Sequence, residues 1–257
     1  MQQPQVASLF PPEWTNDEIL ERAKQVQKLG IERGLQYRCV ASGEFLRIGL
    51  LQNPFRADIM QKKPLKEQRI VEIGCGFGID VRYLIRQLGV SKDHVVAIDV
   101  APAFIELGYE LFQDKEAVES CFHVKSVGDE DFVSFVRDKF SGNPVDVVLA
   151  FQVLHTIPQY NEKVVKDVFQ LVAPAKGVFM GTTIGIREDR EEPRYFHRQG
   201  VARIAHTQQS ITRLLKQVGG FHRVKTQFLE RNIASDSKEW TAENTETSPL
   251  AFIAFVE

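Results

Sequence analysis

Apolar positions in the N-terminal part of the chain recur at helical spacing. Thr15 and Glu18 form a capping-box pattern, which predicts that a helix begins here, and Gly30 is the expected left-handed end of that helix. A second helical pattern covers residues 33–51 and ends before an Asn-Pro pair. The pattern therefore predicts a helical lead-in over residues 1–60, which depends on the rest of the chain for its packing.

Short apolar runs alternate with helical patterns in the rest of the chain. Strands are predicted at residues 69–73, 94–100, 122–126, 145–150, 177–183, 221–229 and 250–256, and helices at 79–88, 103–112, 131–140, 162–172 and 208–218. Strands joined by helices form a mostly parallel sheet that is covered on both faces. The last two strands are separated by a polar stretch at residues 231–248, so we expect them to form an antiparallel hairpin. The charged segment 184–206 interrupts the alternation.

The composition excludes several classes of protein. Of the 257 residues, 43% are hydrophobic and 26% are charged, as in globular domains rather than disordered chains. The net charge of −2 and the absence of basic runs argue against nucleic-acid and membrane-surface partners. No apolar stretch approaches the ~18 residues of a membrane span, and the start lacks a secretory pattern. Three widely spaced cysteines, with no C-x-x-C pair, indicate a reduced, cytoplasmic setting and no metal site. A homodimer is compatible with the sequence.

Three glycines alternate where the first predicted strand gives way to a helix. This is the position at which parallel sheets bind ligands, and Gly74, Gly76 and Gly78 would let the backbone approach one closely. A tight turn alone needs only one glycine. Ile79 stands where the dinucleotide fingerprint G-x-G-x-x-G needs its third glycine, and the Glu72 carboxylate would repel a diphosphate. The turn therefore disfavours a nicotinamide oxidoreductase and suits S-adenosylmethionine, which carries a sulfonium and an amino group.

The chain from about residue 66 onward resembles the class I S-adenosylmethionine-dependent methyltransferases. The resemblance is carried by the motif at residues 72–78, by an acidic residue that ends the second strand, and by the segment 151–158 after the fourth strand. It implies a Rossmann-like, doubly wound α/β fold with a seven-stranded sheet of order 3-2-1-4-5-7-6 and an antiparallel last strand. The methyltransferase domain would span residues 61–257, with the lead-in as a helical cap and residues 184–206 as a substrate-covering insertion.

The resemblance also implies which residues contact the cofactor. They are Tyr37, Glu72, Gly74, Cys75, Gly76, Asp99, Val100, Gly128, Asp129, Phe151 and Gln152. Asp99 would accept hydrogen bonds from the two ribose hydroxyls, although a helix N-cap would also place an aspartate here. The neighbouring Asp131 leaves the register of the adenine contact at Asp129 open. Tyr37 would close over the cofactor's carboxylate or be part of the core.

The segment after the fourth strand narrows the class of methyl acceptor. It has neither the Asn/Asp-Pro-Pro-aromatic box typical of amide and adenine nitrogen methylation nor a cysteine for cytosine methylation. With the near-neutral charge, this favours a small-molecule acceptor. His155 is the candidate base for a hydroxyl acceptor, and a histidine that only packs or faces the substrate is the alternative. The lead-in, with Tyr37-Arg38-Cys39 at its centre, resembles that of carboxyl O-methyltransferases of fungal meroterpenoid biosynthesis. That resemblance implies an ionised carboxylate acceptor, which His155 would orient without removing a proton.

The charged segment 184–206 is the candidate acceptor contact. Five arginines and an aromatic pair could bind an anionic, partly apolar molecule, and the candidate residues are Arg194, Tyr195, Phe196, Arg198 and His206. Four carboxylates nearly balance the arginines, so a solvated surface loop is the alternative. The sequence predicts an enzyme that methylates a carboxylate or hydroxyl of a small, largely apolar secondary metabolite by in-line transfer and releases S-adenosylhomocysteine. A protein of the same fold that binds the cofactor structurally, or acts as a cyclase, is the alternative function.

Overall fold

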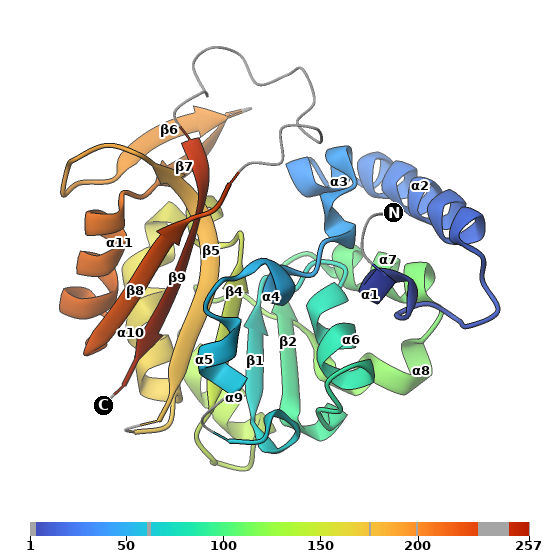
Figure 1. Ribbon diagram of the computed structural model, residues 1–257, viewed down its shortest axis with the longest axis horizontal. Coiled ribbons are helices and arrows are strands. Elements are labelled where there is room, and N and C mark those ends of the chain that lie inside the picture. The colour runs from blue at the N-terminus through green and yellow to red at the C-terminus, as the bar shows by residue number, and fades with distance from the viewer. Residues whose placement is uncertain (1–3, 61–62, 175, 199, 231–246, 257) are drawn as a thin grey trace.

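A seven-stranded sheet forms the centre of the protein (Figure 1). The computed structural model describes residues 4–60, 63–174, 176–198, 200–230 and 247–256. The strands are β1 (Ile70–Ile73), β2 (Val95–Asp99), β3 (Phe122–Val124), β4 (Val147–Phe151), β5 (Val178–Ile186), β8 (Arg223–Phe228) and β9 (Thr247–Phe255). Their order, β3-β2-β1-β4-β5-β9-β8, confirms the predicted order, with β8 and β9 in the last two positions. β9 is antiparallel to β5 and β8, as predicted, and most of the polar stretch before it lies outside the described residues.

Side chains alternate along the strands, so both faces of the sheet are apolar and both are covered by helices. One face packs against the lead-in, α6 (Ile79–Arg86) and α7 (Pro102–Phe112). The other packs against α9 (Phe132–Lys139), α10 (Asn161–Leu171) and α11 (Gln208–Arg213), which continues into a π-helical turn, η7 (Leu214–Val218). Shorter helices, η3 (Lys92–His94), α8 (Lys115–Val118) and η4 (Glu119–Cys121), complete the connections. The five predicted helices are therefore present, with ends shifted by a few residues.

The lead-in is helical, as predicted, but it is broken into short pieces. They are α1 (Pro4–Ala7), α2 (Asn16–Glu32), α3 (Arg38–Ser42), η1 (Glu44–Leu46), α4 (Gly49–Gln52), α5 (Arg56–Met60) and η2 (Leu65–Glu67). The capping box is present: Glu18 N donates to Thr15 Oγ1, and the Glu18 carboxylate accepts from Thr15 N at 2.7 Å. The predicted continuous helix over 33–51 is wrong, because Gly43 adopts a left-handed conformation (φ 73°) that ends α3.

The predicted end of the first helix at Gly30 is also wrong. Gly30 lies inside α2, and a Cβ there would be 3.1 Å from Val40 Cγ1, so the glycine serves the close packing of α2 on α3. The chain turns four residues later, at Gly34, where φ is 81° and an added Cβ would meet no atom within 4 Å beyond its chain neighbours. Gly30 therefore allows two helices to approach closely and does not end a helix.

The charged segment 184–206 contains a second, two-stranded sheet. β5 extends to Ile186, and β6 (Arg194–Arg198) then pairs antiparallel with β7 (Val201–Ala205). His206 N and Ile186 N form backbone hydrogen bonds that fasten the end of β7 to β5. This part of the segment is therefore a hairpin, which projects at the upper edge of the molecule in Figure 1, the same edge as α3. Among the described residues, no helix is long and apolar enough to cross a membrane.

Candidate active site

The glycine turn between β1 and α6 has a left-handed backbone at all three glycines. The φ angles of Gly74, Gly76 and Gly78 are 67°, 55° and 71°, a region that other residues rarely adopt. A Cβ at Gly74 would lie 2.5 Å from Val153, and one at Gly78 would lie 2.4 Å from Phe122. At Gly76 the nearest atom would be 4.0 Å away. Protein packing therefore explains the first and third glycines, whereas the second borders open space that a ligand could fill.

Two other predicted cofactor contacts, Glu72 and Cys75, are buried beside this turn. Glu72 is 3% exposed, and among the described residues its Oε2 has no hydrogen-bond partner. Burial, followed by the charges of Asp80 and Asp99, raises the Glu72 pKa well above its usual range. Burial likewise raises the pKa of the Cys75 thiol, and its backbone N–H donates to Ile98 O at 3.0 Å. A buried carboxylate oxygen without a partner fits the cationic amino and sulfonium groups of S-adenosylmethionine.

Asp99 ends β2 next to the same turn. Its Oδ2 accepts from Gly76 N at 2.9 Å, and its Oδ1 accepts from Ala101 N at 2.9 Å. The N-cap of α7 is Ala101, so Asp99 does not occupy the capping position that was the alternative to a ribose contact. Burial raises the Asp99 pKa, and the backbone N–H groups oppose this rise. Each carboxylate oxygen retains acceptor capacity for a hydroxyl group.

The predicted adenine contacts lie at the ends of β2 and β3. Val100 is 62% exposed directly after β2, which suits an apolar surface against a ring. Gly128 lies under Tyr160, because a Cβ at residue 128 would be 2.8 Å from the Tyr160 Cζ. The Asp129 carboxylate pairs with Lys125 at 3.0 Å, and the N-cap of α9 is Asp131. Asp131 makes no side-chain capping hydrogen bond, and its carboxylate pairs with Lys125 as that of Asp129 does.

Phe151 and Gln152 form the end of β4. Gln152 has a φ of 59°, which is uncommon for a residue other than glycine, and its backbone N–H donates to Thr182 O at 2.8 Å. Its side-chain Nε2 also donates to Thr182 Oγ1 at 3.1 Å. The Phe151 ring lies against Gly49 of the lead-in, where a Cβ would be 2.6 Å from the ring. The turn after β4 is thus fixed by β5 on one side and by α4 on the other.

A buried carboxylate attaches the lead-in to the glycine-turn region. Asp80, in the first turn of α6, accepts from Gly49 N at 2.9 Å and from Leu50 N at 2.8 Å. Burial raises the Asp80 pKa to about 6, and these two backbone hydrogen bonds oppose the rise. Asn53 adds a further attachment, because its Nδ2 donates to Gly181 O of β5 at 3.0 Å.

Tyr37 lies where the lead-in meets the site. It is the N-cap residue of α3, 36% exposed, and its ring is 5.2 Å from the Phe104 ring between centroids. Burial and then the Asp99 charge raise the Tyr37 pKa, and the Arg203 charge opposes this rise. The charges of Asp99 in the glycine-turn region and of Arg203 in the β6–β7 hairpin thus both act on Tyr37, which is not a core residue.

His155 lies directly after β4, in the short helix η5 (Leu154–Thr156), and is half-buried. Strand β7 of the hairpin packs against η5, so the hairpin covers the segment that carries His155. His155 and the hairpin are thus brought together beyond the carboxyl ends of the parallel strands, where ligands bind in sheets of this type.

The hairpin separates the residues of the predicted acceptor contact. Cross-strand partners share a face, so Phe196 lies beside Arg203, its partner in the register. Tyr195 lies on the opposite face and is 66% exposed. Arg194 forms an ion pair with Glu188 and Arg198 ends β6. Tyr195 is therefore separated from the face of the hairpin that carries Phe196.

His206 is not placed as predicted for an acceptor contact. It is 2% exposed, its Nε2 is 3.3 Å from Asn161 Nδ2, and its Nδ1 is 3.1 Å from Ser210 Oγ. Burial lowers the His206 pKa to about 4, which favours the neutral ring that these contacts need. His206 thus joins the end of β7 to α10 and α11.

The sequence assigned no role to Asp80 or Arg82, and Arg203 was one of the five arginines of the segment 184–206 without being singled out among them. Asp80 and Arg82 are charged residues within a predicted helix whose other positions are largely apolar, which was the available signal of a buried polar contact. Residues 201–205 do not alternate between apolar and polar positions, so the sequence carried no signal that would place Arg203 beside Phe196.

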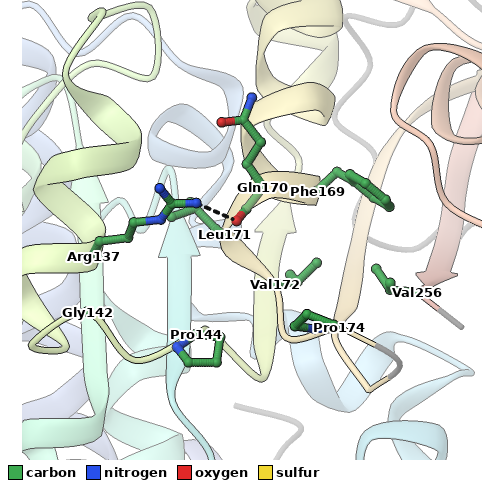
Figure 2. Close-up of a pocket in the computed structure, with 9 residues that line it drawn as sticks. All are labelled: Arg137, Gly142, Pro144, Phe169, Gln170, Leu171, Val172, Pro174 and Val256. Atoms are coloured by element: carbon green, nitrogen blue, oxygen red, sulfur yellow. Dashed lines mark hydrogen bonds between the residues drawn. The ribbon is translucent and has the colours of Figure 1, made fainter.

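A cavity of about 580 Å³ lies at the opposite edge of the sheet (Figure 2). It is lined by Arg137, Gly142, Pro144, Phe169, Gln170, Leu171, Val172, Pro174 and Val256. Figure 2 shows Arg137 reaching across it to the Gln170 carbonyl, to which it donates at 3.0 Å. The lining residues precede β4 and β5 and follow β9, so the cavity is at the amino ends of the parallel strands and is not part of the candidate site.

The fold and the glycine turn are those of an α/β protein that can bind a ligand at the carboxyl ends of its parallel strands, and comparison with known proteins specifies the family. Residues 71–179 match the methyltransferase domain family, so the chain contains an S-adenosylmethionine-dependent methyltransferase domain, as predicted from the sequence. S-adenosylmethionine is the cofactor of this class.

The sequence relatives are fungal methyltransferases. Methyltransferase adrK of Penicillium rubens is 26% identical over 189 residues, which cover 70% of this chain and 66% of that protein. O-methyltransferase atr3 of Stereocaulon alpinum is 26% identical, with coverage of 81% of this chain and 60% of that protein. O-methyltransferase phiE of a fungal species is 29% identical, with coverage of 69% and 57%. The matched part thus spans less than two thirds of the length of these relatives.

Solved structures share the fold. A Mesorhizobium loti S-adenosylmethionine-dependent methyltransferase has a TM-score of 0.51 and 16% identity, and the match covers 80% of this chain and 100% of that one. Human N-acetylserotonin methyltransferase, solved with its cofactor, has a TM-score of 0.51 and 14% identity, with coverage of 96% and 60%. At these identities the comparison supports the fold alone.

Proposed function

We propose that this protein is an S-adenosylmethionine-dependent O-methyltransferase that acts on a small, largely apolar natural product, at a carboxylate or a hydroxyl group. The observation that carries the cofactor half of the proposal is the buried Glu72 oxygen, which has no partner among the described residues, beside the open side of Gly76. The names of two relatives, both O-methyltransferases, support oxygen as the methylated atom.

The acceptor half of the proposal rests on the region between the lead-in and the hairpin. Two aromatic rings and one positive charge come from elements that face the carboxyl ends of the strands. The rings belong to Tyr37 and Phe196, and the charge belongs to Arg203. Aromatic walls suit an apolar skeleton, and a guanidinium suits a carboxylate. An acceptor carboxylate bound by Arg203 would arrive already ionised, so transfer would need alignment rather than proton removal.

The chain's own residues would act mainly by positioning. When bound, S-adenosylmethionine supplies an electrophilic methyl group on a sulfonium. Glu72 would balance the positive charge of the cofactor, Asp99 would hold its ribose, and the lead-in and hairpin would exclude water from the acceptor. His155, beneath β7, would donate a hydrogen bond to an acceptor carboxylate or remove the proton from an acceptor hydroxyl.

Product analysis tests this proposal. The purified protein is incubated with S-adenosylmethionine and a panel of apolar carboxylic acids, each paired with the corresponding alcohol, and products are identified by mass spectrometry. We expect methyl esters of at least some acids and an equal amount of S-adenosylhomocysteine. Unchanged cofactor with every acceptor, despite measurable cofactor binding, would contradict the proposal and favour a protein that uses the cofactor structurally.

A further inference from the structure

Arg82 is fully buried behind the glycine turn. Its side chain is 0% exposed, although it carries a full charge. Its Nη1 donates to Phe77 O at 2.7 Å and to Gly78 O at 3.1 Å, two carbonyl groups of the turn itself. Its Nε and Nη2 donate to the two carboxylate oxygens of Asp114, each at 2.7 Å. One guanidinium therefore joins the glycine turn to the segment that follows α7.

The surroundings of Arg82 hold its guanidinium in a single orientation. The guanidinium carbon lies 4.3 Å from the centroid of the Phe112 ring and 5.2 Å from that of the Phe122 ring. Asp114, its carboxylate partner, is 7% exposed. A planar guanidinium with two-point binding to a carboxylate has little freedom to reorient. Its remaining N–H groups are therefore directed at the turn in a fixed geometry.

A buried ion pair is weak evidence of a stabilising role, because apolar residues of similar volume often serve stability as well. What apolar residues cannot do is donate hydrogen bonds to the carbonyls of Phe77 and Gly78. These carbonyls belong to the part of the turn that has left-handed backbone at Gly76 and Gly78. Arg82 also provides positive charge near Glu72, where it opposes the effect of burial on the pKa of that carboxylate.

We propose that Arg82 is a positioning residue for S-adenosylmethionine: it holds the glycine turn in the cofactor-binding conformation by binding the carbonyls of Phe77 and Gly78 from behind. It does not touch the cofactor. The proposal concerns cofactor binding by the methyltransferase domain and is independent of the acceptor.

Arg86 offers a matched control. It pairs with the same carboxylate, since its Nη2 is 2.7 Å from Asp114 Oδ2, and it also donates to Leu9 O of the lead-in. It makes no hydrogen bond with the turn among the contacts of the described residues. Loss of Arg86 thus removes an ion pair with Asp114 while leaving the contacts with Phe77 and Gly78 intact.

The experiment compares Arg82→Lys with Arg86→Lys by calorimetric titration with S-adenosylmethionine and with S-adenosylhomocysteine. We expect Arg82→Lys to weaken binding of both about tenfold or more, because lysine lacks the planar fork that joins Asp114 to the turn. We expect Arg86→Lys to stay within about twofold of the original protein. The melting temperature of each variant is measured in parallel, since a purely structural role would lower stability without changing the affinity of the folded protein.

A folded Arg82→Lys variant with unchanged affinity would overturn the proposal. If this variant does not fold, Asp114→Asn provides the same test, because it weakens the anchor of Arg82 but retains an acceptor oxygen. Weaker cofactor binding by Asp114→Asn, with normal binding by Arg86→Lys, supports the positioning role. Normal binding by Asp114→Asn contradicts it.

Discussion

The glycine-turn region buries charged side chains, whereas the β6–β7 hairpin and its surroundings hold them in ion pairs that are exposed to solvent. Near the glycine turn, Glu72, Asp80 and Asp99 are buried to 3%, 4% and 8% exposure. At the hairpin, charges are paired in solvent: the Arg194 side chain is 43% exposed and its partner Glu188 is 26% exposed. Arg213 and Glu192 form a similar pair at 36% and 63% exposure.

This difference indicates what each region binds. Buried carboxylates are costly unless a cation or hydrogen-bond donor completes them. Backbone N–H groups complete Asp80 and Asp99, so we infer that the Glu72 oxygen, which has no partner among the described residues, is the one that a cationic ligand would complete. Exposed ion pairs contribute only about 0–1 kcal/mol each and can exchange partners at little cost. We therefore expect the hairpin to tolerate acceptors of different shapes and the glycine turn to bind a single cofactor.

The largest expected effect concerns the buried carboxylate of Asp80. Its folded-state pKa of about 6 lies above the usual 3.8. Between these two pH values, Asp80 is protonated in the folded protein and ionised in the unfolded chain. The contribution of Asp80 to stability is therefore fully present below about pH 4 and is lost as the pH rises through about 6. We expect the original protein to lose about 3 kcal/mol of unfolding free energy over this range relative to Asp80→Asn.

Denaturant unfolding of the two proteins at a series of pH values measures this difference. Asp93, on the exposed helix η3, provides a control, and Asp93→Asn should follow the original protein throughout. If the unfolding free energies of Asp80→Asn and the original protein changed in parallel with pH, Asp80 would behave like an exposed carboxylate, and this prediction would be wrong.

A smaller effect is expected on the acceptor side. We expect Arg203→Ala to raise the acceptor KM about tenfold, the loss of one hydrogen bond to a charged group, with cofactor affinity unchanged. Arg194→Ala should change the acceptor KM less than about threefold, because Arg194 is paired with Glu188 in solvent. Steady-state kinetics with a carboxylic acid found by product analysis measure both. Equal effects of the two substitutions would show that the ion pair with Glu188 does not separate Arg194 from Arg203 in acceptor binding.

The strands and the glycine turn could be predicted from the sequence because they depend on local patterns, whereas the sheet order followed from the resemblance to a known family. Strand periodicity and three closely spaced glycines need no knowledge of distant contacts. The hairpin was not predicted because neither of its strands, Arg194–Arg198 and Val201–Ala205, shows the alternation of apolar and polar residues that is typical of a strand. The role of His206 could not be predicted, since its partner Asn161 is 45 positions away in sequence. Arg82 was hidden for the same reason, because its anchor, Asp114, lies 32 positions further on.

The central claim, that the glycine turn binds S-adenosylmethionine, is tested most directly by one titration. Gly76 and Gly89 have φ angles of 55° and 67°, and neither has an atom closer than 4.0 Å to the position of an added Cβ. Alanine thus imposes a similar backbone cost at both, but only residue 76 borders the site. We predict that Gly76→Ala weakens S-adenosylmethionine binding about ten- to hundredfold, whereas Gly89→Ala binds like the original protein. Equal binding by all three proteins would contradict the claim.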